Sequence, residues 1–177
     1  MSARKKIAAI ITEYRVSAHA DVIVGKFIKG FPTDEGLIAP RVDIASMYLD
    51  QIPENDIGLA LAEKYGIPVY RSIRQALCLG GDELAVDGVL LIGEHGDYPV
   101  NDKGQKLYPR YEFFEQILDV FRADGRAVPV FNDKHLSYSF EKARRMVEAS
   151  RELEFPLLAG SSLPVTYRLP PVELPLG

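Results

Sequence analysis

Short apolar runs alternate with longer amphipathic segments along most of this chain. Six runs are mostly apolar and have the length of buried strands: 6–12, 42–49, 68–70, 86–92, 127–131 and 155–159. Five segments between them carry apolar residues at helical spacing: 18–29, 54–65, 73–79, 111–122 and 139–153. Gly30, Gly66 and Gly125 each follow one of these segments, where glycine commonly ends a helix. The pattern predicts strands that alternate with helices.

This alternation predicts an α/β fold, because strand–helix–strand units place their strands in parallel and cover both faces of the sheet. We expect a Rossmann-like three-layer sandwich with a mostly parallel sheet of about six strands. A flavodoxin-like strand order fits the same pattern. The predicted domain spans residues 1–162, and the proline-rich segment 163–177 is predicted to be an extended strap or linker.

The composition is that of a globular domain. The chain has 177 residues, of which 47% are hydrophobic and 26% charged, enough for one domain with a core. A net charge of −4 and the lack of a dense cluster of basic residues predict no nucleic-acid partner. No signal-like or membrane-spanning apolar run is present, so we expect a cytoplasmic protein without a membrane contact. The single cysteine, Cys78, excludes an internal disulfide.

All three histidines follow a strand-like run. His19 comes after the first run, His95 after the fourth and His135 after the fifth. The carboxyl ends of parallel strands meet at one edge, which is where open α/β folds bind ligands. The sequence therefore predicts one polar site for a small-molecule ligand.

The fourth and fifth strands are followed by dense polar segments. In Gly93-Glu94-His95-Gly96 the glycines permit a sharp turn that exposes both side chains, and His95 is a candidate acid or base. Glu94 and His19 are tentative metal ligands together with His95 and His135. A merely solvated turn is the alternative.

The segment after the fifth strand supplies further candidates. Lys134 and His135 are predicted catalytic residues, while Asn132 and Asp133 are predicted to bind substrate or cofactor. The alternative is a plain ion pair between Asp133 and Lys134.

Five more residues are candidates for binding substrate or cofactor. Arg15 can hold a carboxylate or phosphate with two hydrogen bonds, and Asp50 ends the second strand, where an acid can bind a ribose diol. The others are Glu13, near the first strand, and Ser161 and Ser162, near the last.

The turn after the first strand lacks the glycines of a dinucleotide site. Residues 12–18 contain no glycine, and Glu13 would repel a pyrophosphate. This disfavours the usual mode of NAD binding. Two cofactors remain possible: NAD(P) bound in another way, and a divalent metal.

Two segments resemble the Gfo/Idh/MocA family, named for glucose-fructose oxidoreductase and inositol dehydrogenase. They are Asp87–Ile92 followed by a loop with His95, and Val128–Ser137 with Asp133-Lys134-His135. In the second segment the family has Glu-Lys-Pro where this chain has Asp133-Lys134-His135, so His135 takes the position of the family's proline. The resemblance covers residues 5–160 and implies an N-terminal Rossmann domain, oxidoreductase chemistry on sugar-like substrates and an active-site role for Lys134.

Three functions follow as hypotheses. The first is an enzyme domain for a sugar or sugar-acid-like molecule, with acid–base residues at the carboxyl edge. The second is a non-catalytic ligand-binding or scaffold domain. The third is a metal-dependent lyase or hydrolase that uses the histidines. Homo-oligomerisation is compatible with all three.

Overall fold

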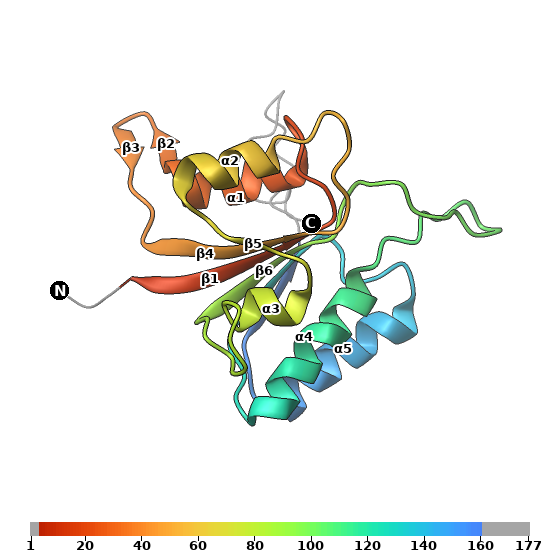
Figure 1. Cartoon of the computed structure of the whole chain (residues 1–177). Helices are drawn as coiled ribbons and strands as arrows, with labels where there is room; N and C mark the ends of the chain where they lie inside the picture. The colour runs from red at the N-terminus through yellow and green to blue at the C-terminus, as the bar shows by residue number, and fades with distance from the viewer. Residues whose placement is uncertain (1–3, 161–177) are drawn as a thin grey trace, which may run out of the picture.

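A six-stranded sheet lies between two layers of helices in the computed structural model, which describes residues 4–160 (Figure 1). The sheet strands are β1 (Lys5–Ile11), β4 (Val42–Leu49), β5 (Val69–Tyr70), β6 (Gly88–Ile92), β7 (Val130–Asp133) and β8 (Leu157–Gly160). The helices are α1 (His19–Lys29), α2 (Gly58–Tyr65), α3 (Ile73–Leu77), α4 (Arg110–Asp124) and α5 (Phe140–Glu152). The predicted Rossmann-like fold is confirmed. The predicted strap lies outside the described residues.

The order of the strands identifies the topology. It runs β5-β4-β1-β6-β7-β8, and every neighbouring pair is parallel. In chain order these six strands follow the sequence 3-2-1-4-5-6, which is the Rossmann arrangement rather than the flavodoxin-like one. The direction of winding reverses between β1 and β6. Ligands of open α/β sheets bind beyond the carboxyl ends of the strands at such a reversal.

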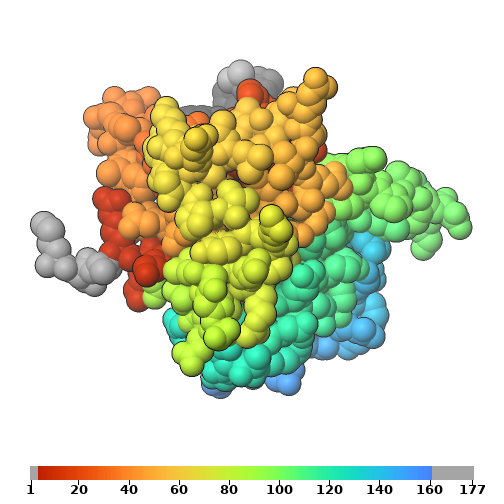
Figure 2. All heavy atoms as spheres, viewed as in Figure 1, coloured from red at the N-terminus to blue at the C-terminus, as the bar shows by residue number. Residues whose placement is uncertain are grey.

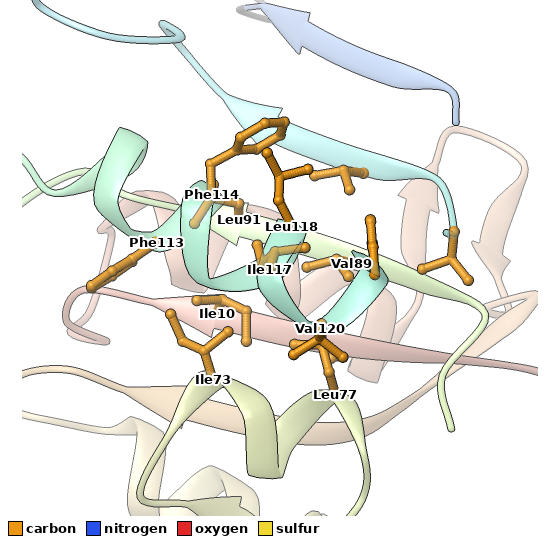
Figure 3. Close-up of a cluster of buried hydrophobic side chains, with 14 of the residues drawn as sticks. Ile10, Ile73, Leu77, Val89, Leu91, Phe113, Phe114, Ile117, Leu118 and Val120 are labelled. Atoms are coloured by element: carbon orange, nitrogen blue, oxygen red, sulfur yellow. The ribbon is translucent and has the colours of Figure 1, made fainter. Parts of the chain in front are cut away.

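Apolar faces of the helices hold the layers together. α1 and α2 cover one face of the sheet, and α3, α4 and α5 cover the other (Figure 1). Figure 3 shows how side chains of α4 fill the space above β6 and beside α3. α4 ends at Gly125, whose φ of 59° is left-handed and whose N–H is donated to the carbonyls of Phe121 and Arg122. The packed core fixes the end of β6, two residues before Glu94, and the start of α4 at Arg110.

A short hairpin lies where the sequence predicts only a loop. β2 (Phe31–Thr33) and β3 (Gly36–Ile38) pair in an antiparallel manner apart from the main sheet. All six residues are exposed, so no burial pattern marks them, and Pro32 is atypical of a strand. An apolar hollow of about 510 Å³ separates this hairpin from α1, with Phe27 and Ile38 in its lining. None of the polar residues described below lines it.

Within residues 4–160, no helix has both the length and the apolar character needed to cross a membrane.

The core of α4 should dominate the stability of the domain. Phe114 is fully buried, whereas Phe140 at the start of α5 is 83% exposed. Replacing Phe114 with alanine leaves a cavity, so we expect the free energy of unfolding to fall by about 3 to 5 kcal/mol. Phe140→Ala is the matched control and should change it by less than about 0.5 kcal/mol. Urea titrations followed by circular dichroism measure both, and equal effects would contradict the assigned core.

Candidate functional site

A hydrogen bond between His19 and Asp133 lies at the carboxyl edge of the sheet. His19 is the first residue of α1 and Asp133 the last residue of β7, and the His19 Nδ1 and Asp133 Oδ2 atoms are 2.5 Å apart. Asp133 is only 4% exposed, while a quarter of the His19 side chain is open to solvent. A carboxylate on Nδ1 fixes the ring and its tautomer. Within residues 4–160, the other ring nitrogen, Nε2, makes no hydrogen bond and can accept or give a proton.

His95 packs edge-on against His19. The two ring centroids are 5.1 Å apart at an angle of 86°. His95 has a φ of 70° and is followed by Gly96 with a φ of 109°, so the chain turns sharply after β6 as the two glycines predict. Arg15 places Nη2 3.2 Å from Nδ1 of His95. Burial, with the nearby charges of Arg15 and His19, lowers the pKa of His95 below its usual value, so the ring is neutral at pH 7.

Glu94 forms an ion pair with a buried arginine. Arg110 is the first residue of α4, is 2% exposed and donates from Nη2 to Glu94 Oε2. Burial lowers the pKa of Arg110, and the charge of Glu94 acts against this shift. A Cβ at Gly93 would lie 2.5 Å from Cγ of Arg110, so glycine there allows the arginine to enter. The nearby Tyr108 ring lies 5.1 Å from the guanidinium.

A second ion pair joins the two candidates in the loop after β1. Arg15 Nε lies 2.5 Å from Oε1 of Glu13, which is 8% exposed. Between them Tyr14 is fully buried, and its carbonyl accepts a hydrogen bond from Ile57 N at 2.8 Å. A Cβ at Gly58, the first residue of α2, would lie 2.8 Å from that of Tyr14. The loop therefore packs against α2 and does not form a tight turn.

The segment after β6 is also attached to the end of β4. Asp50 accepts hydrogen bonds from the hydroxyls of Tyr48 and Tyr98, each at 2.7 Å. Gln51 exchanges two hydrogen bonds with the backbone of Asp97, at 2.8 and 3.0 Å. The predicted binding residue Asp50 is thus engaged by the chain itself.

Three of these side chains have the composition of a metal site. Within the described residues, donor atoms of His19, Glu94 and Asp133 all lie within 4.8 Å of one another. His19 and Glu94 were predicted metal ligands, whereas Asp133 was predicted as a binding residue. His95 adjoins the group through its contact with His19.

The other predicted residues are placed as follows. Lys134 is half-buried directly after Asp133, and His135 is exposed on the loop after β7, outside the contact between the other two histidines. Asn132 is fully buried, with Nδ2 donating to the Asp133 carbonyl at 2.8 Å and Oδ1 lacking a partner among residues 4–160. Its amide therefore supports the local turn. Ser161 and Ser162 lie outside the described residues.

The sequence patterns do not identify the contacts of Arg110 with Glu94 and of Tyr98 with Asp50. Arg110 opens an amphipathic helix, where an arginine is normally solvated, and Tyr98 lies in a polar loop. Gly93 is the one sequence signal that could have indicated the contact with Arg110, because a glycine directly after a buried strand indicates that another group approaches closely.

Comparison with known proteins gives a likeness of fold. No family model matches the sequence, and neither does any curated protein sequence. A dehydrogenase from Clostridium difficile is 15% identical; the match covers 89% of this chain and 39% of that protein, with a TM-score of 0.55. Myo-inositol 2-dehydrogenase from Lactobacillus plantarum is 11% identical. The match covers 88% of this chain and 36% of that protein, with a TM-score of 0.55.

GenD2 from gentamicin A biosynthesis, solved in complex with NAD, is 22% identical over 90% of this chain and 35% of its own, with a TM-score of 0.55. In fold, the chain is therefore similar to Gfo/Idh/MocA-type dehydrogenases, in agreement with the resemblance seen in the sequence. It spans between 35% and 39% of the length of these three proteins.

Removing the charge of Glu94 should destabilise the domain because Arg110 would stay buried without a counter-ion. For Glu94→Gln we expect the free energy of unfolding to fall by about 2 to 3 kcal/mol, less than for a fully buried pair because the Glu94 side chain is 22% exposed. Glu141→Gln, which breaks an exposed pair with Arg144 on α5, is the control and should leave the unfolding midpoint unchanged. Urea titration at pH 7 measures both. Equal midpoints for the two variants would show that the Arg110 charge is satisfied by other means.

The lowered pKa of His95 predicts a loss of stability in mild acid. The unfolded chain takes up a proton near pH 6.5, whereas folded His95 resists protonation. The free energy of unfolding should therefore fall as the pH drops below about 6.5, by at most about 1.4 kcal/mol per pH unit for this proton, until the folded pKa is reached. The variant His95→Gln should show a shallower decline between pH 7.5 and 5.5. Identical slopes in urea titrations would contradict the assignment.

Proposed function

We propose that this domain binds a small, hydroxyl-bearing polar molecule at the carboxyl edge and exchanges a proton with it through His19. The observation that carries the proposal is the hydrogen bond from His19 Nδ1 to the buried carboxylate of Asp133. It lies at the reversal of strand order, where this fold offers a ligand site. The likeness of fold to dehydrogenases named for inositol and for a sugar nucleotide supports a sugar-like or sugar-acid-like ligand and an oxidoreductase-related domain.

The proposed proton transfer uses the free nitrogen of His19. A substrate hydroxyl donates its hydrogen bond to Nε2, and its proton moves to that atom as negative charge develops on the substrate oxygen. Asp133 holds the ring in place and stabilises the imidazolium that forms, as a buried carboxylate does for a catalytic histidine. Alcohol oxidation starts with this step and also needs a hydride acceptor. In a dehydration the reverse transfer, from the imidazolium to a hydroxyl, lets that hydroxyl leave as water.

Neighbouring residues would bind and orient the ligand. Arg15 is only partly used by Glu13 and His95, and its guanidinium has donors suited to a carboxylate of a sugar acid. Neutral His95 accepts from Arg15 at Nδ1, which leaves a proton on Nε2 for a substrate oxygen. Lys134, next to the buried carboxylate, stays a candidate acid–base residue, whereas His135 is the competing candidate for the role of His19.

A metal-dependent reaction is the second candidate, because His19, Glu94 and Asp133 bring their donor atoms within 4.8 Å of one another. An imidazole with two carboxylates suits a divalent transition metal. The ion would have to break the hydrogen bond between His19 and Asp133 and share Glu94 with Arg110. These two costs make direct proton transfer the better-supported function.

The role of His19 can be tested by binding and turnover together. Thermal shifts with myo-inositol, gluconate and glucuronate identify a ligand, and NMR of the mixture with and without NAD⁺ detects conversion. For a converted ligand, we expect His19→Asn to bind within about threefold of the wild type and to react about 10²- to 10⁴-fold more slowly, because asparagine can keep a donor for Asp133 but offers no base. The matched variant His135→Asn should retain activity.

Three outcomes would contradict this proposal. Unchanged turnover in His19→Asn with loss in His135→Asn would move the catalytic role to His135. Turnover that disappears with a chelator and returns with Zn²⁺ or Mn²⁺ would establish the metal-dependent function. Ligand binding without any conversion would favour the non-catalytic domain.

A further inference from the structure

We propose that the crevice in which this fold elsewhere holds a dinucleotide is filled by the chain's own segment 93–99, so that no nicotinamide dinucleotide binds there. A dinucleotide in a Rossmann fold lies across the strand ends at the reversal of order, with its ribose on the acid after the second strand. Residues of this protein lie along each part of that path.

The segment after β6 crosses the end of β1 and reaches the end of β4. Glu94 is held over β1, because its carbonyl accepts from Thr12 Oγ1 at 2.6 Å. Three residues further on, Asp97 is held by Gln51 beyond β4, with its N–H donated to Gln51 Oε1 at 2.8 Å and its carbonyl accepting from Nε2 at 3.0 Å. β1 lies between β6 and β4 in the sheet, so the segment follows the path of a dinucleotide. Its continuation projects beside α4 (green in Figure 2).

The acid that would bind the ribose already holds two hydroxyl groups. Tyr48 donates to one oxygen of Asp50 and Tyr98 donates to the other, both at 2.7 Å. This pair of hydroxyls takes the place of a ribose diol. Burial, followed by the hydrogen bond to Asp50, raises the pKa of both tyrosines, so both stay protonated donors over the whole physiological range.

Carboxylates already lie at the position of the pyrophosphate. A dinucleotide places its phosphates at the N-terminus of the first helix, close to a glycine turn. Here Asp133 lies against His19, the first residue of α1, and Asp21 accepts from Ser17 N at 3.1 Å in the same turn. Glu13 adds a third carboxylate, largely shielded from solvent. Asp133 and Asp21 therefore already occupy the positive end of the helix, while Glu13 is paired with Arg15.

The contacts across the crevice also give Asp50, Gln51 and Tyr98 a role. They anchor the segment that carries Glu94 and His95, so they are positioning residues for the site. Hydride transfer to a dinucleotide in this crevice is therefore excluded, and the proton transfer proposed above does not depend on it.

Two measurements on the same protein test this inference. Isothermal titration with NAD⁺, NADP⁺ and ADP-ribose to millimolar concentration should give no saturable heat. Amide exchange followed by NMR should show the Asp97 N–H protected in the wild type and exchanging about fivefold faster in Gln51→Leu, the factor equivalent to about 1 kcal/mol for a lost hydrogen bond. The matched control Gln116→Leu, on the exposed surface of α4, should leave the Asp97 rate unchanged.

Two outcomes would overturn the proposal. Saturable NAD⁺ binding that ADP-ribose displaces, together with faster exchange at Asp97, would mean that the segment opens to admit the dinucleotide. An Asp97 rate that does not respond to Gln51→Leu would mean that the segment is not held across the crevice. Binding of NAD⁺ with unchanged Asp97 protection would place the nucleotide elsewhere and agree with a filled crevice.

Discussion

The buried charges at the carboxyl edge must be paired, because an unpaired buried charge is very costly. Two ion pairs and one hydrogen bond meet the requirement: Glu94 with Arg110, Glu13 with Arg15, and the hydrogen bond of His19 to Asp133. The His19–Asp133 hydrogen bond joins α1 to β7, the Glu94–Arg110 pair joins the loop after β6 to α4, and Arg15 of the Glu13–Arg15 pair contacts His95. The loops after β1, β6 and β7 are held in one arrangement as a result. These contacts fix the side chains of the site relative to one another, although the site is built largely from loops.

The same contacts distinguish this site from the phosphate-binding site of a Rossmann dehydrogenase, although the fold is similar. A Rossmann domain binds phosphate with backbone N–H groups at a glycine turn, and this needs an open and positive helix end. Here the helix end faces carboxylates, and Tyr14 takes up the space against α2 that a tight turn would leave free. Similarity of fold is compatible with this change, since a fold fixes where a ligand site lies and the side chains decide its chemistry.

The sequence predicted the layers well because buried parallel strands are short apolar runs, and the strand 42–49 has the predicted bounds. The convergence of His19, Glu94 and His95 was predictable for the same reason, since each follows a strand end. The hairpin at 31–38 was not, because it buries no face. The pairs of Asp133 with His19 and of Tyr98 with Asp50 depend on loop paths across separations of 114 and 48 residues, which no local pattern records.

One electrostatic feature explains why both proton transfer and metal binding emerge as candidates. Glu13, Glu94 and Asp133 bring three carboxylates, and Arg15 and Arg110 bring two guanidiniums, so these five groups leave one negative charge uncompensated. A positive charge gained at His19, either as a proton from a substrate or as a bound metal ion, balances it. Arg110 separates the two cases, because it is 2% exposed, cannot leave Glu94 without losing its counter-ion, and would repel a divalent ion placed beside it. A proton on Nε2 of His19 meets neither obstacle, and the arrangement therefore favours acid–base chemistry by the His19–Asp133 pair.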